Sequence, residues 1–149
     1  MQKHSFMPVH FSDREMTRAW KNNFQAYNLA QPKTNAHRLL LFYSVECGLK
    51  AAKMRRDKIN STLACPEIIS KCGHDINKLL DILNVEKKLR IPQRIRMDSN
   101  RQVSVDEINQ MWRYGGEAIT DIRDHSLTDK ELESCLIRVS KWIEQELRQ

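Results

Sequence analysis

The sequence predicts an all-α protein, a bundle of about five main helices in a single domain covering residues 1–149. Three observations favour this fold class. The longest apolar run, within residues 35–56, is consecutive rather than alternating. Several other stretches repeat apolar side chains at helical spacing, and none alternates long enough to predict a strand. Only four glycines and four prolines interrupt the chain, so long regular segments are expected.

The first helix is expected to follow residues 1–11, which are predicted to be irregular. Ser12 and Glu15 form a capping box, in which the hydroxyl and the carboxylate bind two backbone N–H groups that the first turn leaves unpaired. The helix should extend to about Asn28, because Pro32 breaks it shortly afterwards. Four side chains at helical spacing form its apolar face, which we interpret as core: Met16, Trp20, Phe24 and Tyr27.

The central helix is expected to begin at Thr34 or Asn35 and to run to about Asp57. Residues 39–43 are consecutively apolar, so they cover every side of a helix. A helix that is apolar all round lies inside other helices. The run is too short and too interrupted by charge to span a bilayer. The rest of the bundle is therefore expected to pack around this helix.

Glu46 is the exception in the central helix, a carboxylate that follows its most apolar segment. Burial of an unpaired charge is costly, so Glu46 either has a partner or lies in a wet cleft. Alternatively, Glu46 forms an exposed pair with Lys50 one turn later. The last turns of the helix are basic, which complements the helix dipole. The cations there are Lys50, Lys53, Arg55, Arg56 and Lys58.

The middle of the chain predicts two short helices and one irregular segment. Pro66 suits a first helical position, and Gly73 then interrupts the helix. The next helix lies within residues 74–83, where one side is apolar: Ile76, Leu79, Leu80 and Leu83. Residues 84–103 are the least regular part and hold six basic residues between positions 87 and 101. A long segment of this kind is either a binding loop or a simple connection.

Two more capping boxes predict the last two helices. Ser104 with Glu107 begins a helix that two consecutive glycines end. Residues 117–127 form a turn or a short helical piece. Thr128 with Glu131 begins the final helix, whose heptad stripe is either core or a dimer seam. The stripe consists of Leu132, Cys135 or Leu136, Val139, Trp142 or Ile143, and Glu146 or Leu147.

The charge is unevenly distributed along the chain. The formal net charge is +6, with +10 in residues 1–101 and −4 in residues 102–149. This asymmetry favours a basic face for an acidic partner such as nucleic acid, a nucleotide or another protein. The alternative is a solvated basic surface. The N-terminus is neither long nor apolar enough for a signal peptide, so a cytoplasmic protein without membrane contact is expected.

The cysteines and the usual catalytic motifs exclude several chemistries. Cys47 and Cys135 fall in apolar stripes and are expected to be buried thiols. Cys65 and Cys72 with His74 fit no common zinc spacing. The sequence contains no phosphate-binding glycine loop, no G-x-S-x-G and no HExxH. We therefore expect no metal and no cofactor, and the sequence assigns no catalytic residue.

Seven polar residues beside the apolar stripes are the candidate binding residues: Glu46, Lys50, His74, Asp75, Lys78, Arg113 and Tyr114. If the bundle brings these residues together, Arg113 would hold a phosphate by two hydrogen bonds, and Tyr114 could stack on a base. His74 could act as an acid or base. For each histidine, including His37 and His125, the alternative is a purely structural role.

Three segments resemble the HEPN family, all-helical domains of toxin–antitoxin, CRISPR-linked and phage-defence systems. They are LLLFYSVECGLKAAK at 39–53, CGHDINKLLDIL at 72–83 and MWRYGG at 111–116. The resemblance implies a HEPN-like bundle over most of 12–148 and a homodimer. Active HEPN ribonucleases carry an R-x4-6-H motif. This chain lacks it, because no Arg lies five to seven residues before any of its histidines.

The resemblance therefore implies a non-catalytic subunit that binds RNA or a nucleotide in a bacterial defence or toxin–antitoxin system, with a partner protein from the same system. One alternative is a metal-independent ribonuclease with a non-standard site. The other is a scaffold subunit that docks a partner protein through its last helix, while the basic segment 84–103 is merely solvated.

Overall fold

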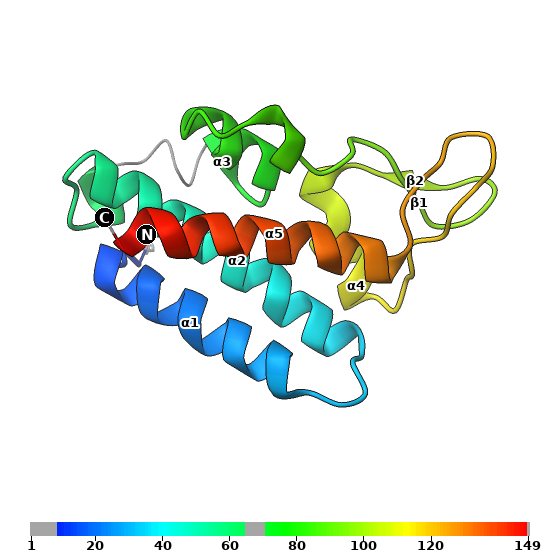
Figure 1. Ribbon diagram of the computed structural model, residues 1–149, viewed down its shortest axis with the longest axis horizontal. Helices are drawn as coiled ribbons and strands as arrows, with labels where there is room; N and C mark the ends of the chain where they lie inside the picture. The colour runs from blue at the N-terminus through cyan, green and yellow to red at the C-terminus, as the bar shows by residue number, and fades with distance from the viewer. Residues whose placement is uncertain (1–8, 65–70, 149) are drawn as a thin grey trace, which may run out of the picture.

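A computed structural model describes residues 9–64 and 71–148 of the chain. Within these residues the fold is mostly helical (Figure 1), which confirms the predicted all-α class. The helices are α1 (Asp13–Leu29), α2 (Asn35–Arg56), α3 (Ile76–Ile82), α4 (Ile108–Arg113) and α5 (Asp129–Arg148). Three short 3-10 turns span Thr62–Ala64, Lys87–Leu89 and Val105–Glu107. The helix predicted from Pro66 lies outside the described residues.

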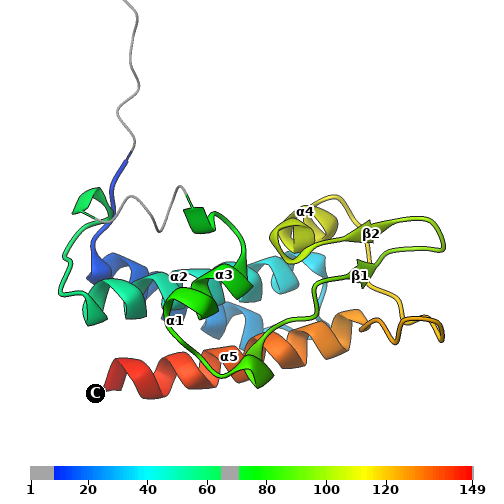
Figure 2. The ribbon, with the colours of Figure 1, turned by 90° about the horizontal axis from the view of Figure 1, so that it is seen from above.

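Helix α2 lies at the centre of the molecule and packs against each of the other four helices, as its all-round apolar sequence predicts. Helices α2 and α5 run in the same direction, and α1 runs opposite to both (Figure 1). Viewed from above, α4 lies on the side of α2 that faces away from α5, whereas α3 lies over the space between α2 and α5 (Figure 2). Helix α2 can therefore contribute residues to surfaces on two sides of the bundle.

The helix starts follow the predicted caps. Ser12 and Glu15 form the first capping box, and Ser104 with Glu107 forms the second. At the third, the backbone N–H of Thr128 donates to the Glu131 carboxylate, while the Thr128 hydroxyl accepts from the Glu131 N–H. Side chains at these three starts thus bind some of the backbone N–H groups that the first helical turn leaves unpaired.

The expectation that the chain forms no strand is wrong within residues 84–103. Strand β1 (Ile95–Arg96) pairs antiparallel with β2 (Gln102–Val103). Two residues per strand are too few to show an alternating pattern, so periodicity misses this hairpin. Its turn is formed by Asp98, whose carboxylate accepts from the backbone N–H groups of the two residues before β2.

The apolar stripe of α5 belongs to the core of this chain. Leu132, Leu136, Val139 and Ile143 are fully or almost fully buried among residues of the other helices. The alternative of a dimer seam does not apply to these four side chains. In the described part of the chain, no helix has the length and apolar character needed to cross a membrane.

Candidate functional site

Glu46 is buried on α2 and has two cationic or polar partners. The residue is 7% exposed. One carboxylate oxygen lies 3.4 Å from Lys50 Nζ, and the other lies 2.6 Å from His74 Nδ1. Lys50 is itself buried. The predicted Glu46–Lys50 pair therefore exists, but it is buried rather than exposed, and the partner that burial demanded is present.

His74 lies just before α3, where local backbone geometry fixes its position. Gly73 adopts φ +52°, a left-handed conformation that favours glycine. Asp75 caps α3 by accepting from the backbone N–H of Lys78 at 3.1 Å. A carboxylate oxygen accepts hydrogen bonds, so its contact with Nδ1 suits the imidazole tautomer that carries the proton on Nδ1 and leaves Nε2 as an acceptor. The His74 side chain is 52% exposed, so this imidazole is within reach of a ligand.

Tyr43 connects His74 to α4. Its ring centroid lies 6.4 Å from that of His74 in an edge-to-face arrangement. Its hydroxyl accepts a hydrogen bond from Arg113 Nη2 at 2.5 Å. This bond also raises the pKa of the Arg113 guanidinium, which stays cationic. We call the five residues Tyr43, Glu46, Lys50, His74 and Arg113 the polar cluster.

The polar cluster thus contains four of the seven predicted residues, from three different elements. Tyr114 is adjacent: its phenol also raises the Arg113 pKa, and the residue is 79% exposed. It borders a depression of about 350 Å³ that is lined in part by Met97 and Met111. The carboxylate of Asp75 serves as the α3 cap. Lys78 is exposed, and its side chain takes part in no ion pair within the described residues.

Sequence reasoning missed Tyr43, which links the two halves of the cluster. The signal that could have found it is its position one turn before Glu46, on the same face of α2. An apolar run that covers every side of a helix conceals such a residue, because an aromatic ring within it is expected to be core.

Cysteine chemistry at this site is disfavoured. Burial and the neighbouring Glu46 carboxylate raise the pKa of the Cys47 thiol to about 11. The thiol is therefore protonated near neutral pH and is a weak nucleophile. Within the described residues, no three His, Cys, Asp or Glu side chains gather in a group that could hold a metal ion. Cys65 lies outside those residues.

The basic segment 84–103 is largely neutralised by its own surroundings. Four of the six basic residues between positions 87 and 101 pair with carboxylates. The pairs are Lys88–Glu86 at 3.0 Å, Arg90–Asp81, Arg96–Asp124 at 2.6 Å and Arg101–Asp98 at 2.7 Å. Paired cations leave less free charge for a polyanion. The structure therefore favours the simple connection over the binding loop for most of this segment.

Comparison of the chain with protein-family models, with curated proteins and with solved structures finds no match.

Proposed function

We propose that this chain is a HEPN-like, non-catalytic subunit that binds RNA or a nucleotide, and that it acts as a homodimer in a bacterial defence or toxin–antitoxin system. The observation that carries the binding proposal is the polar cluster, in which Arg113 and His74 flank Tyr43 at the surface. The fold name, the homodimer and the biological system rest on the three segments that resemble HEPN domains.

The chemistry of the cluster suits a phosphate with an attached base. Arg113 is exposed and cationic, and its Nη2 donates to the Tyr43 hydroxyl. The other N–H groups of the guanidinium can therefore donate to phosphate oxygens. Tyr114 offers an exposed ring beside a depression, and aromatic rings of this kind stack on unpaired bases. Lys50 is engaged by Glu46, so we assign it a role in holding the cluster together.

A second candidate function is metal-independent RNA cleavage, which the Glu46–His74 hydrogen bond favours. A carboxylate that holds Nδ1 fixes the imidazole tautomer and orients Nε2 as a base. Nε2 would take the proton of the RNA 2′-hydroxyl as its oxygen attacks phosphorus, and the leaving 5′-oxygen must receive another proton. The cluster contains one imidazole, so a second proton donor is not assigned. Binding is therefore the first proposal.

The test is fluorescence anisotropy of a labelled 20-nucleotide single-stranded RNA with the parent protein, R113A and H74A, with K130A as the control. Lys130 is an exposed cation on the first turn of α5. A charge-assisted hydrogen bond is worth about 1.5–3 kcal/mol, so R113A should weaken binding about tenfold or more, and K130A should bind like the parent.

Gel analysis of the same RNA in EDTA separates the two candidate functions. Intact RNA with loss of affinity in R113A supports the binding subunit. Cleavage that H74A abolishes supports the ribonuclease instead. If R113A and H74A both bind RNA as the parent does, the polar cluster is not the site.

A further inference from the structure

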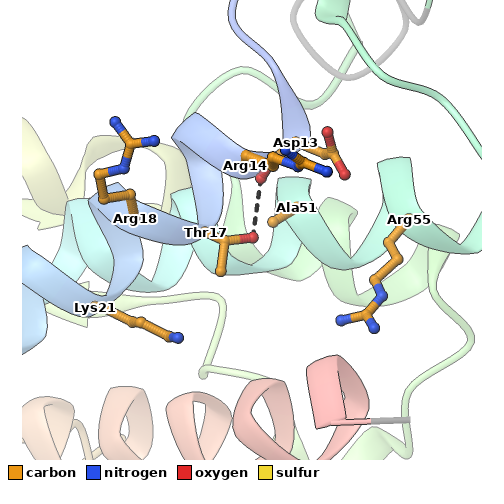
Figure 3. A pocket seen from close by; sticks show the side chains of 7 residues that line it. All are labelled: Asp13, Arg14, Thr17, Arg18, Lys21, Ala51 and Arg55. Atoms are coloured by element: carbon orange, nitrogen blue, oxygen red, sulfur yellow. Dashed lines mark hydrogen bonds between the residues drawn. The ribbon is translucent and has the colours of Figure 1, made fainter.

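A second basic surface lies between the first half of α1 and the last half of α2, away from the polar cluster. It is a depression of about 510 Å³ that shares no residue with the cluster (Figure 3). Its lining residues are Asp13, Arg14, Thr17, Arg18, Lys21, Ala51 and Arg55. We call it the α1–α2 groove. Four of the seven side chains are cations and one is a carboxylate, so the groove is strongly positive.

Three of these cations form a row on α1. Arg14, Arg18 and Lys21 are exposed and lie four and three residues apart, which places them on one side of the helix. None of the three takes part in an ion pair within the described residues, in contrast to the segment 84–103. Like charges at these spacings destabilise a helix. The row therefore destabilises the free protein, and a bound anion would reduce the repulsion between its three cations.

The nearest acid along α1 does not neutralise the row. Glu15 accepts from the Ser12 backbone N–H at 2.9 Å in the capping box. Bonding to Ser12, with a smaller contribution from Arg18, lowers the Glu15 pKa. Asp13, at the end of the groove, is the one carboxylate among the lining residues. The positive charge of the groove is thus only partly compensated.

Arg55 contributes the fourth cation from the opposite helix. Its guanidinium donates to the main-chain carbonyl of Leu147 on α5, a partner without net charge. Figure 3 shows Lys21 and Arg55 extending toward each other from α1 and α2. This contact therefore orients Arg55 in the groove without pairing it with an acid.

The groove continues into a second depression of about 700 Å³ between α1 and α5. The two depressions share Thr17, Lys21 and Arg55. The second is lined by apolar side chains as well, namely Trp20, Phe24, Ile137 and Leu147. A cationic row thus borders an apolar and aromatic groove, which is the combination that proteins use to bind single-stranded nucleic acid.

We infer that the α1–α2 groove binds the phosphodiester backbone of single-stranded RNA, with a base entering the adjoining apolar depression. This inference rests on the proposed RNA-binding function and adds a second contact surface to it. From Arg14 to Lys21 the helix rises about 10 Å, since each residue adds about 1.5 Å. A row of this length faces several phosphates of an extended strand, and would extend the RNA footprint beyond the polar cluster.

The test compares the parent with two variants of equal net charge. R14Q/R18Q/K21Q removes the row, and the control K87Q/R94Q/K130Q removes three exposed cations elsewhere. No described ion pair involves any of the six residues. Anisotropy of a labelled 20-nucleotide oligouridylate is measured from 50 to 200 mM KCl. Each phosphate contact contributes about −0.7 to the slope of log K against log salt for a single strand.

The inference predicts that the row variant loses about 2 units of this slope and about tenfold or more in affinity at 50 mM KCl, while the control changes little. Equal losses of affinity in both variants, or no loss in the row variant, would contradict RNA binding in the α1–α2 groove. The polar cluster would then remain the proposed RNA site. Absence of RNA binding by the parent would overturn both proposals together.

A competition arm separates RNA from an acidic protein partner. Poly-L-glutamate should displace the RNA only at much higher charge concentration than unlabelled oligouridylate does. Suppose that the two competitors are equally effective on the parent and that the row variant binds neither poly-L-glutamate nor oligouridylate. The groove is then a surface for acidic polypeptides, and the RNA assignment is wrong. Circular dichroism and thermal melting confirm that each variant is folded.

Discussion

Replacement of Glu46 by leucine should destabilise the fold strongly, because it leaves a buried ammonium group without its partner. Glu46 and Lys50 are both buried, and their charged atoms lie 3.4 Å apart. Removal of one partner of a buried ion pair costs about 3–5 kcal/mol. Lys50 has a long flexible stem that can carry the ammonium toward water, so we expect E46L to lower the free energy of unfolding by about 3 kcal/mol.

The double variant E46L/K50M is the matched control. It removes both charges and fills the same space with apolar side chains, and such replacements are often neutral or stabilising. We expect its free energy of unfolding to lie within about 1 kcal/mol of the parent's. The single variant K50M completes the double-mutant cycle, and if K50M does not stabilise the fold, the coupling between Glu46 and Lys50 is about 2 kcal/mol or more.

Urea unfolding monitored by circular dichroism at pH 7 is the assay. With an m-value of about 1.5–2 kcal/mol/M, a loss of about 3 kcal/mol lowers the midpoint by about 1.5–2 M. A cost below about 1 kcal/mol for E46L would show that the pair does not stabilise the fold. A double variant that is no more stable than E46L would show that Lys50 does not need the carboxylate.

Three other substitutions test the packing and the hairpin. G48A should cost about 1–2 kcal/mol of unfolding free energy, because its Cβ would lie 2.8 Å from Trp20 and overpacking outweighs the helix gain of alanine. L136D should prevent folding, which circular dichroism detects, because it places a charge in the core. If the L136D variant were instead folded and monomeric, the α5 stripe would be a dimer seam. Arg96 lowers the pKa of Asp124, so this pair stabilises the fold above about pH 4 and its contribution disappears as pH falls through the lowered pKa. Urea unfolding of R96Q should therefore show a deficit at pH 6 that shrinks by pH 3.

The helices were predictable from sequence because their signals are local. Each capping box fixes a helix start within a few residues of chain, and the apolar run of α2 predicts a central position without knowledge of its neighbours. The β1–β2 hairpin was not predictable in this way. Its strands are too short for periodicity, and the turn that joins them depends on hydrogen bonds of Asp98.

Four of the five members of the polar cluster were predictable from sequence, but Tyr43 and the geometry of the cluster were not. Burial of Glu46 demanded a partner, yet only the packing of α3 and α4 on α2 selects His74 and places Arg113 against Tyr43. The cationic row of α1 was missed for another reason. The apolar stripe of a helix predicts which side is buried but carries no information about a ligand on the exposed side. The fourth cation of the groove, Arg55, comes from a different helix.

The central claim is that RNA binds at the polar cluster, and the most direct test is a nuclear magnetic resonance titration of the histidine ring signals with single-stranded RNA. H74Q assigns the His74 signals, and His125, in the loop before α5, serves as the internal reference. We expect the His74 ring signals to shift in proportion to bound RNA while those of His125 stay in place. RNA binding that leaves the His74 signals unmoved would contradict the claim.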